Sequence, residues 1–234
     1  MALDVYVMPL WRFKTGDFST PIEEGLGLEP TIITSDGVVR PSQRRSRDWT
    51  SLLRRFRARR ETRAIRKAVE SANLVRVRWN DDGPVQYSQQ SPGFEALRAY
   101  ARWLDCRDRI PRFDAPPERD YYKHPVMKEQ ISNPGCPHLV GHSCFSGYYL
   151  PVDFEKVVQV EPYLILGYYP ATHAVGSSPR LMKELDRIQV DLQAPADQRL
   201  DASDPLVDVK VAYLQLRDIA ELSCRHGLPV IFHG

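Results

Sequence analysis

The chain has 234 residues, with 32 basic and 30 acidic side chains, a formal net charge of +2 and 42% hydrophobic residues. This balance excludes collagen-like, coiled-coil and largely disordered chains, and the length suits one domain with a sizeable core. The N-terminal stretch has no basic leader, and the longest uncharged stretch, 162–179, contains glycine and proline, so we expect neither an export signal nor a membrane helix. Four cysteines in such a chain indicate reduced thiols in a cytoplasm.

The first third of the chain predicts two strands, an irregular segment and a long helix. Alternating apolar and polar residues at 3–10 are typical of a half-buried strand, and the β-branched run 31–34 predicts a weaker one. Residues 35–47 hold glycine, proline and serine and read as an exposed irregular segment. A helix is expected over 49–72, with Asp48 as N-cap. Its two apolar stripes point in different directions, so it is either two short helices or one helix with two contacts.

The near-neutral net charge hides a basic strip. Twelve basic and two acidic residues lie between Arg40 and Lys67, a charge of +10, which leaves 20 basic and 28 acidic residues elsewhere, a charge of −8. One interpretation is a surface for phosphate, nucleic acid or an acidic protein. The other is a solvated helix face that pairs with the acidic body of the same chain. The candidate binding residues are Arg54, Arg55, Arg57, Arg59, Arg60 and Arg63.

The middle of the chain predicts a hairpin, a helix and a long connection. Residues 74–79 alternate like a strand, and 85–88 would return after an Asn-Asp-Asp-Gly-Pro turn. Ser91-Pro92 opens a helix that extends to Leu104. Residues 110–135 show no period and are expected to be irregular. Strands are predicted at 148–154 and 163–169.

The last third predicts two helices and a terminal strand. A helix starts at Ser178-Pro179, another runs from Asp204-Pro205 to His226, and 228–232 reads as a buried strand beside 3–10 or 148–154. We therefore predict a single α+β domain over 1–234, with a mixed or mostly antiparallel sheet and helices packed to one side.

The stretch from Cys136 to Cys144 is the most suggestive for chemistry, because it also holds His138 and His142. Two Cys and two His form a tetrahedral zinc set, although zinc sites usually draw their two ligand pairs from separate elements. The alternatives are a Cys136–Cys144 disulfide, a Cys144 nucleophile with His142 as base, or a packed loop with no chemistry.

Three further residues are candidates. Ser177 and Ser178 could bind an anion at a helix N-terminus, or Ser178 could simply cap the helix. Asp153 lies between two apolar residues of a predicted strand, where alternation favours an outward side chain over a placed functional group.

The chain resembles a group of bacterial proteins with no established activity. The shared pattern is His-Leu-x-x-His-Ser from His138, then Gly-Tyr-Tyr-Leu-Pro-Val-Asp-Phe from Gly147, then Gly-Ser-Ser-x-x-Leu-x-x-Glu-Leu from Gly176. The resemblance implies a bacterial cytoplasmic protein in which His138, His142, Asp153 and Ser177 belong to one local unit. In that pattern the two cysteines are not fixed, which leaves a HxxxH pair and one carboxylate as an incomplete metal or acid–base set.

The leading functional hypothesis is a non-enzymatic cytoplasmic binding protein, such as an immunity-like or regulatory partner of another protein. No Walker loop, GxGxxG, GxSxG or HExxH motif occurs. The first alternative is a hydrolase or transferase that uses His138, His142 and Asp153 in the segment 136–153, with or without a metal such as zinc. The second is nucleic-acid binding through the Arg-rich helix 49–72.

Overall fold

A six-stranded mixed sheet forms the centre of the molecule, with the strand order β4-β1-β8-β5-β7-β6. The computed structural model describes residues 3–17, 26, 31–33, 39–41, 49–83, 86–90, 93–114, 123–142, 146–160, 173–193 and 200–233. The strands of this sheet are β1 (Leu3–Val7), β4 (Gln86–Gln90), β5 (Ser146–Leu150), β6 (Val158–Val160), β7 (His173–Ser177) and β8 (Val230–His233). A separate two-stranded sheet pairs β2 (Thr31–Ile33) with β3 (Val39–Pro41).

The C-terminal strand β8 lies between β1 and β5 and is antiparallel to both. The sequence left open which of these two strands it would join, and it joins both. The β5–β7 pair is parallel, while the other pairs of this sheet are antiparallel. The predicted α+β class with a mixed, mostly antiparallel sheet is therefore confirmed.

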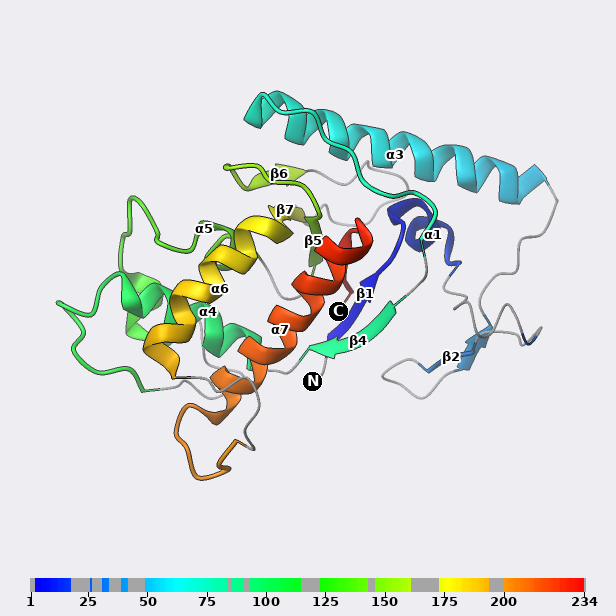
Figure 1. Cartoon of the computed structure of the whole chain (residues 1–234). Coiled ribbons are helices and arrows are strands. Elements are labelled where there is room, and N and C mark those ends of the chain that lie inside the picture. Colours follow the sequence, from blue (N-terminus) through cyan, green and yellow to red (C-terminus); the bar gives the residue numbers. More distant parts are fainter. Residues whose placement is uncertain are drawn as a thin grey trace.

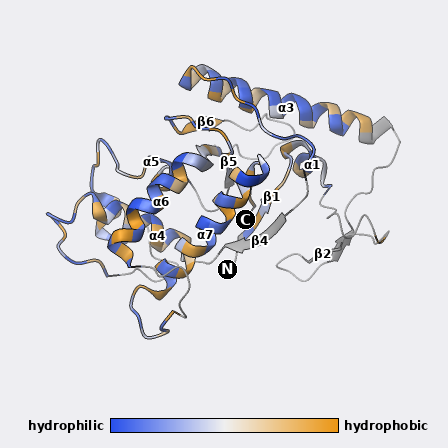
Figure 2. Cartoon of the chain, in the orientation of Figure 1, coloured by the Kyte–Doolittle hydropathy of each residue, from blue (hydrophilic) through white to orange (hydrophobic). Residues whose placement is uncertain are grey.

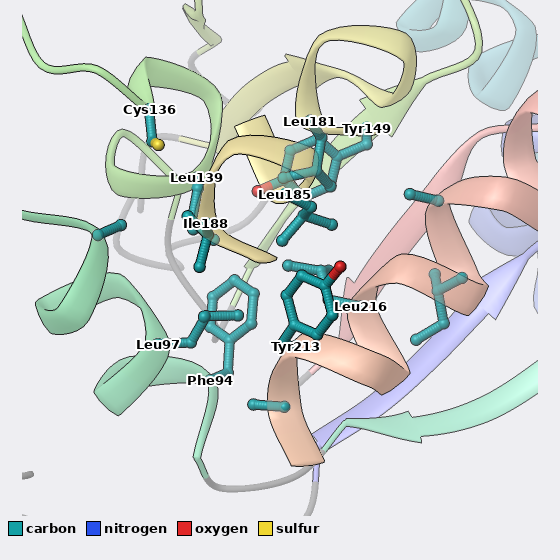
Figure 3. Close-up of a cluster of buried hydrophobic side chains, with 14 of the residues drawn as sticks. Phe94, Leu97, Cys136, Leu139, Tyr149, Leu181, Leu185, Ile188, Tyr213 and Leu216 are labelled. Carbon is teal, nitrogen blue, oxygen red and sulfur yellow. The ribbon is translucent and has the colours of Figure 1, made fainter. Parts of the chain in front are cut away.

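One face of the sheet is covered by a layer of helices. These are α4 (Phe94–Leu104), the short α5 (Pro137–Val140), α6 (Ser178–Leu192) and α7 (Val207–His226). Figure 3 shows their apolar side chains meeting over Tyr149 of β5, with Phe94, Leu185 and Tyr213 among them. Because α6 has apolar residues at positions i, i+4, i+7 and i+11, its inner stripe is fully buried, as the periodicity predicts.

The other face of the sheet has its own core, which the sequence did not lead us to expect. The short α1 (Leu10–Thr15) and the long α3 (Trp49–Asn73) contribute Leu10, Ile65 and Val69 to a cluster with Tyr148 and Ile231. Alternation along the strands sends Tyr148 to this cluster and Tyr149 to the opposite one. Helices thus lie on both sides of the sheet, whereas the prediction placed them on one side. The helix α3 is well separated from the α6–α7 pair (Figure 1).

The predicted strand at 74–79 is wrong. Leu74 ends α3 with a positive φ of 54°, and the backbone N–H of Val77 donates to the Glu70 carboxylate at 3.0 Å instead of to a strand. Val77 and Trp79 are nevertheless buried while Arg76 and Arg78 are exposed. The alternation predicted which side chains face the core, but β4 pairs with β1 and forms no hairpin with this segment.

Three short strands were missed, and some predictions fall outside the described residues. β3 lies within 35–47, which was predicted to be irregular, and pairs with β2. β6 has only three residues, and the sequence of β7, His-Ala-Val-Gly-Ser, does not alternate regularly between apolar and polar residues. The predicted strand at 163–169 and the N-cap at Asp48 lie outside the described part of the chain. Within 110–135, the described residues include the 3-10 helix η2 (Pro125–Lys128). Of the helices that the structure describes, none is long and apolar enough to cross a membrane.

Candidate functional site

His138 joins three segments of the fold through both ring nitrogens. Its Nδ1 accepts a hydrogen bond from the Ser177 backbone N–H at 3.0 Å, and its Nε2 lies 3.1 Å from the Glu155 carbonyl oxygen. Because a carbonyl only accepts, the proton resides on Nε2, and the ring is neutral. Burial lowers the pKa of His138 to about 4. A neutral ring with both nitrogens in use is a structural connector and a poor base or metal ligand.

Glu184 is the buried acidic residue of this junction. Its two carboxylate oxygens accept the backbone N–H groups of His138 at 2.9 Å and Leu139 at 2.8 Å, so it caps the first turn of α5 from α6. Burial raises the pKa of Glu184 to about 7, although both hydrogen bonds oppose the shift. A charged residue one position before Leu185, on the inner stripe of α6, was the sequence signal that could have identified it.

His142 is fully buried against aromatic rings. It stacks on Tyr149 with ring centroids 4.2 Å apart and an interplanar angle of 14°, and Phe232 lies 5.2 Å away. A Cβ on Gly147, whose φ is +134°, would lie 2.7 Å from His142 Nε2, so the glycine is required here. The Tyr149 hydroxyl donates to the His138 carbonyl at 3.0 Å, which links the two histidines through one tyrosine.

The cysteine part of the predicted zinc set is only partly described. Cys136 is buried, and desolvation raises its pKa to about 12, so its thiolate is strongly disfavoured. Cys144 lies outside the described residues. Among the residues that the structure does describe, no group of three or more His, Cys, Asp and Glu could hold a metal ion.

The two serines at the start of α6 are held by internal hydrogen bonds. Ser177, not Ser178, is the N-cap, because its Oγ accepts the Arg180 N–H at 3.2 Å. The Ser178 hydroxyl is 2.7 Å from that of Ser223, which donates to the Leu228 carbonyl. Capping starts one residue earlier than predicted because β7 continues directly into the helix.

Asp153 is separate from the two imidazoles in its contacts. It is exposed and forms ion pairs with Arg180 and, at 3.3 Å, with Lys183. The hydrogen bond from Arg180 lowers its pKa. Since both ring nitrogens of His138 are bonded elsewhere, Asp153 and His138 form no carboxylate–imidazole contact of the kind that acid–base catalysis uses.

The acidic side chains of the α6–α7 layer differ in whether a basic neighbour neutralises them. All three arginine and lysine side chains of α7 form ion pairs: Lys210 with Asp204, Arg217 with Asp186 and Arg225 with Glu221. Within the described ranges, three other exposed carboxylates here form no salt bridge. We call them the acidic group: Asp201, Asp208 and Asp218.

The helix α3 is one continuous helix of 25 residues and not two short ones. Of its two predicted apolar stripes, the second contains the buried Ile65 and Val69, whereas Leu52, Leu53 and Phe56 of the first are exposed. Its buried stripe consists of Ala58, Thr62, Ile65 and Val69. A second row of residues has the same spacing but begins six residues earlier in the chain. Around the helix axis it lies roughly 120° from the buried stripe, and it is exposed to solvent. We call it the outer stripe: Leu52, Phe56, Arg59 and Arg63.

The outer stripe combines unpartnered charge with exposed apolar surface. Phe56 is 70% exposed, Leu52 is 50% exposed and the adjacent Leu53 is 66% exposed. Figure 2 shows orange hydrophobic segments beside blue ones along α3. In the described part of the chain, the ion pairs of α3 are Glu61–Lys14 and Arg66–Asp81, and none involves Arg54, Arg57, Arg59 or Arg63. These four arginines therefore form no ion pair with acidic residues of the described part of the chain. Of the other two candidates, Arg60 is exposed but has contacts of its own, and Arg55 is half-buried.

The exposure of the outer stripe predicts a contrast in stability. Phe56→Ser should change the free energy of unfolding by less than about 0.5 kcal/mol, because the ring touches little of the body. Val69→Ala, on the buried stripe, should lower it by about 2 kcal/mol through lost burial and a cavity. Urea unfolding of both variants measures the contrast. A loss at Phe56 equal to that at Val69 would mean that the ring is packed.

The structure is that of an α+β protein with an exposed, arginine-rich helix α3 over one face of its sheet. On the α7 side of the other face, three exposed carboxylates form no salt bridge within the described ranges. A family model described as "Putative DNA-mimic protein" matches residues 1–232, and the chain belongs to this family. Neither the curated proteins nor the solved structures contain a match. The family is one of protein-binding proteins, which agrees with the predicted binding function in this general form.

Proposed function

We propose that this chain binds a DNA-binding protein at the surface with which that protein contacts DNA. Family membership supports the general idea, since a DNA mimic presents negative charge to a surface built for phosphates. Such surfaces carry arginine and lysine side chains whose affinity for DNA depends on phosphate charge. Carboxylates at suitable positions attract the same side chains.

The observation that carries the proposal is the acidic group on the α7 side of the molecule. With every basic side chain of α7 already in an ion pair, Asp208 and Asp218 leave two charges unneutralised along one helix. They are ten residues apart, or about 15 Å along the axis, which is roughly four base-pair steps of one DNA strand. Asp201 precedes the helix and adds a third charge.

The overall charge of the chain requires that the mimicry be local. A net charge of +2 would repel a basic partner weakly at long range, whereas the chain outside Arg40–Lys67 carries −8. The acidic group belongs to that negative part, and α3 lies on the other side of the sheet. We therefore assign partner binding to the α6–α7 side, and propose a regulatory or immunity-like role in the cytoplasm, where DNA-binding proteins are found.

The test is displacement by DNA. Proteins retained on a DNA column are passed over the immobilised chain, and bound proteins are then challenged with short duplex DNA or with polyglutamate of equal charge. We expect release by the duplex at a lower charge concentration than by polyglutamate, because the captured surface is shaped for DNA. Capture that duplex DNA cannot reverse would contradict the proposal.

Two double variants that each remove two carboxylates locate the binding surface. Asp208→Asn/Asp218→Asn should weaken capture about tenfold or more, since each carboxylate faces a basic side chain of the partner. The matched control is Asp186→Asn/Glu221→Gln, which removes two carboxylates that already have basic partners. Equal losses in both variants would show that total charge, and not the acidic group, determines binding.

A further inference from the structure

We propose that the outer stripe of α3 docks on the α6–α7 side of a second copy of this chain, against the acidic group. The inference rests on the same acidic group as the proposed function, but it concerns a different partner and a different helix. It assigns a role to α3, whose basic side chains have no part in binding a basic DNA-binding protein.

The apolar residues of the stripe point to a protein as the occupant. Leu52, Leu53 and Phe56 are 50–70% exposed on one half of a helix whose other half is firmly packed. Large apolar side chains gathered in this way and surrounded by charges mark protein contact surfaces. A DNA backbone would gain from the arginines but would leave these three side chains without an apolar counterpart.

The charges of the stripe identify an acidic counterpart. The helix α3 has eight basic and two acidic residues, and Arg59 and Arg63 continue the same stripe as Leu52 and Phe56. Two α3 helices would place these arginines against one another, so pairing of α3 with α3 is disfavoured. The α6–α7 layer also offers exposed apolar surface, since Val190 of α6, the helix packed against α7, is 80% exposed. Both surfaces therefore combine apolar side chains with opposite charge.

The docking must occur between copies. Within one chain, α3 packs on one face of the sheet, while α6 and α7 cover the other. A helix held by Ile65 and Val69 on its own body cannot bring its outer stripe round to its own α7 (Figure 1). The contact is consequently head-to-tail, with a different surface on each copy.

Such a contact would regulate the proposed function. An arginine-bearing helix seated on the acidic group resembles, in its chemistry, the surface of a DNA-binding protein. A second copy would therefore compete with that protein for the same carboxylates. Free chain would be masked by self-association, and a partner with a higher affinity would release it.

The experiment is a complementation test by sedimentation with the full chain. An acidic-side variant, Asp208→Lys/Asp218→Lys, and an α3 variant, Phe56→Glu/Arg59→Glu/Arg63→Glu, each lose one of the two surfaces. We expect wild-type chain to associate at low salt and to dissociate as salt rises, with each variant alone at least about tenfold weaker. A mixture of the two variants should form a one-to-one pair, because one intact surface of each kind remains.

Each other outcome overturns the inference. The inference is wrong if wild-type chain is monomeric at low salt or if the α3 variant still associates by itself. It is also wrong if the mixture of the two variants forms no pair. Binding of short duplex DNA that requires α3, without self-association, would assign the stripe to nucleic acid. If circular dichroism shows that either variant is unfolded, Phe56→Ser/Arg59→Gln and Asp208→Asn/Asp218→Asn repeat the test with smaller changes. Self-association needs no partner, so a restored pair with no capture of DNA-binding proteins would leave this inference standing and refute only the proposed function.

Discussion

Replacement of His138 by alanine is expected to lower the free energy of unfolding by about 4 kcal/mol. The substitution removes a buried ring and leaves the Ser177 N–H and the Glu155 carbonyl without their partner. The Ser177 N–H is buried, and an unsatisfied buried polar group costs about 1–3 kcal/mol. The cavity beside Phe154 adds to this cost. For a chain of this size, the melting temperature should fall by roughly 10 °C.

Asp153→Asn is the matched control, because it alters the other residue of the predicted acid–base set. Asp153 is exposed, and its ion pairs with Arg180 and Lys183 are worth about 1 kcal/mol or less in water. Thermal and urea unfolding of both variants provides the comparison. If His138→Ala proved as stable as Asp153→Asn, the imidazole would not be the structural connector that its contacts indicate, and a catalytic role would regain interest.

The junction between His138 and Glu184 is expected to show two opposite pH dependences that nearly cancel. The folded pKa of His138 is lowered from 6.5 to about 4, so the unfolded chain binds more protons in this range and stability rises with pH from 4 to 6.5. The folded pKa of Glu184 is raised from 4.5 to about 7, so the folded chain binds more protons and stability falls as pH rises through this range. Each slope is about 1.4 kcal/mol per pH unit at most.

Single substitutions should reveal the two slopes separately. Glu184→Gln removes the Glu184 contribution and keeps that of His138. The free energy of unfolding of this variant, minus that of wild type, should therefore rise with pH between about 4.5 and 6.5. His138→Gln keeps only the Glu184 contribution, and its stability should fall over the same interval. Urea unfolding at several pH values, taken as differences from wild type, removes the background of the exposed carboxylates. Parallel curves for both variants would contradict the assignment of the two pKa shifts to this junction.

Local patterns in the sequence were sufficient where a segment has a clear period. The stripe of α6, the end of α7 at Gly227, the alternation in β1 and the apolar run at 228–232 each identify an element without knowledge of its neighbours. Segment 74–79 shows the limit of this reasoning, because its alternation is real while its backbone N–H at Val77 bonds to Glu70. Period reports which side chains are buried, and pairing depends on which backbone groups are free.

The candidate site was recognised in part for the same reason. The resemblance implied one local unit of His138, His142, Asp153 and Ser177. In the structure His138 meets Ser177, whereas Asp153 pairs with Arg180 and Lys183. Its chemical interpretation as a metal or acid–base set depended on which atoms the ring nitrogens meet. Those atoms, the Ser177 N–H and the Glu155 carbonyl, are backbone groups, and a residue type carries no signal for them.

Composition and periodicity by themselves determined the α+β class, most of the helices, and the separation of a +10 strip from a −8 body. These properties are local or additive, so they need no knowledge of contacts. Only the tertiary structure decided that helices cover both faces of the sheet, that α3 exposes Phe56 while it buries Val69, and which carboxylates of α7 remain unpaired. Those outcomes depend on contacts between residues far apart in the chain, and local sequence patterns do not determine which of these contacts form.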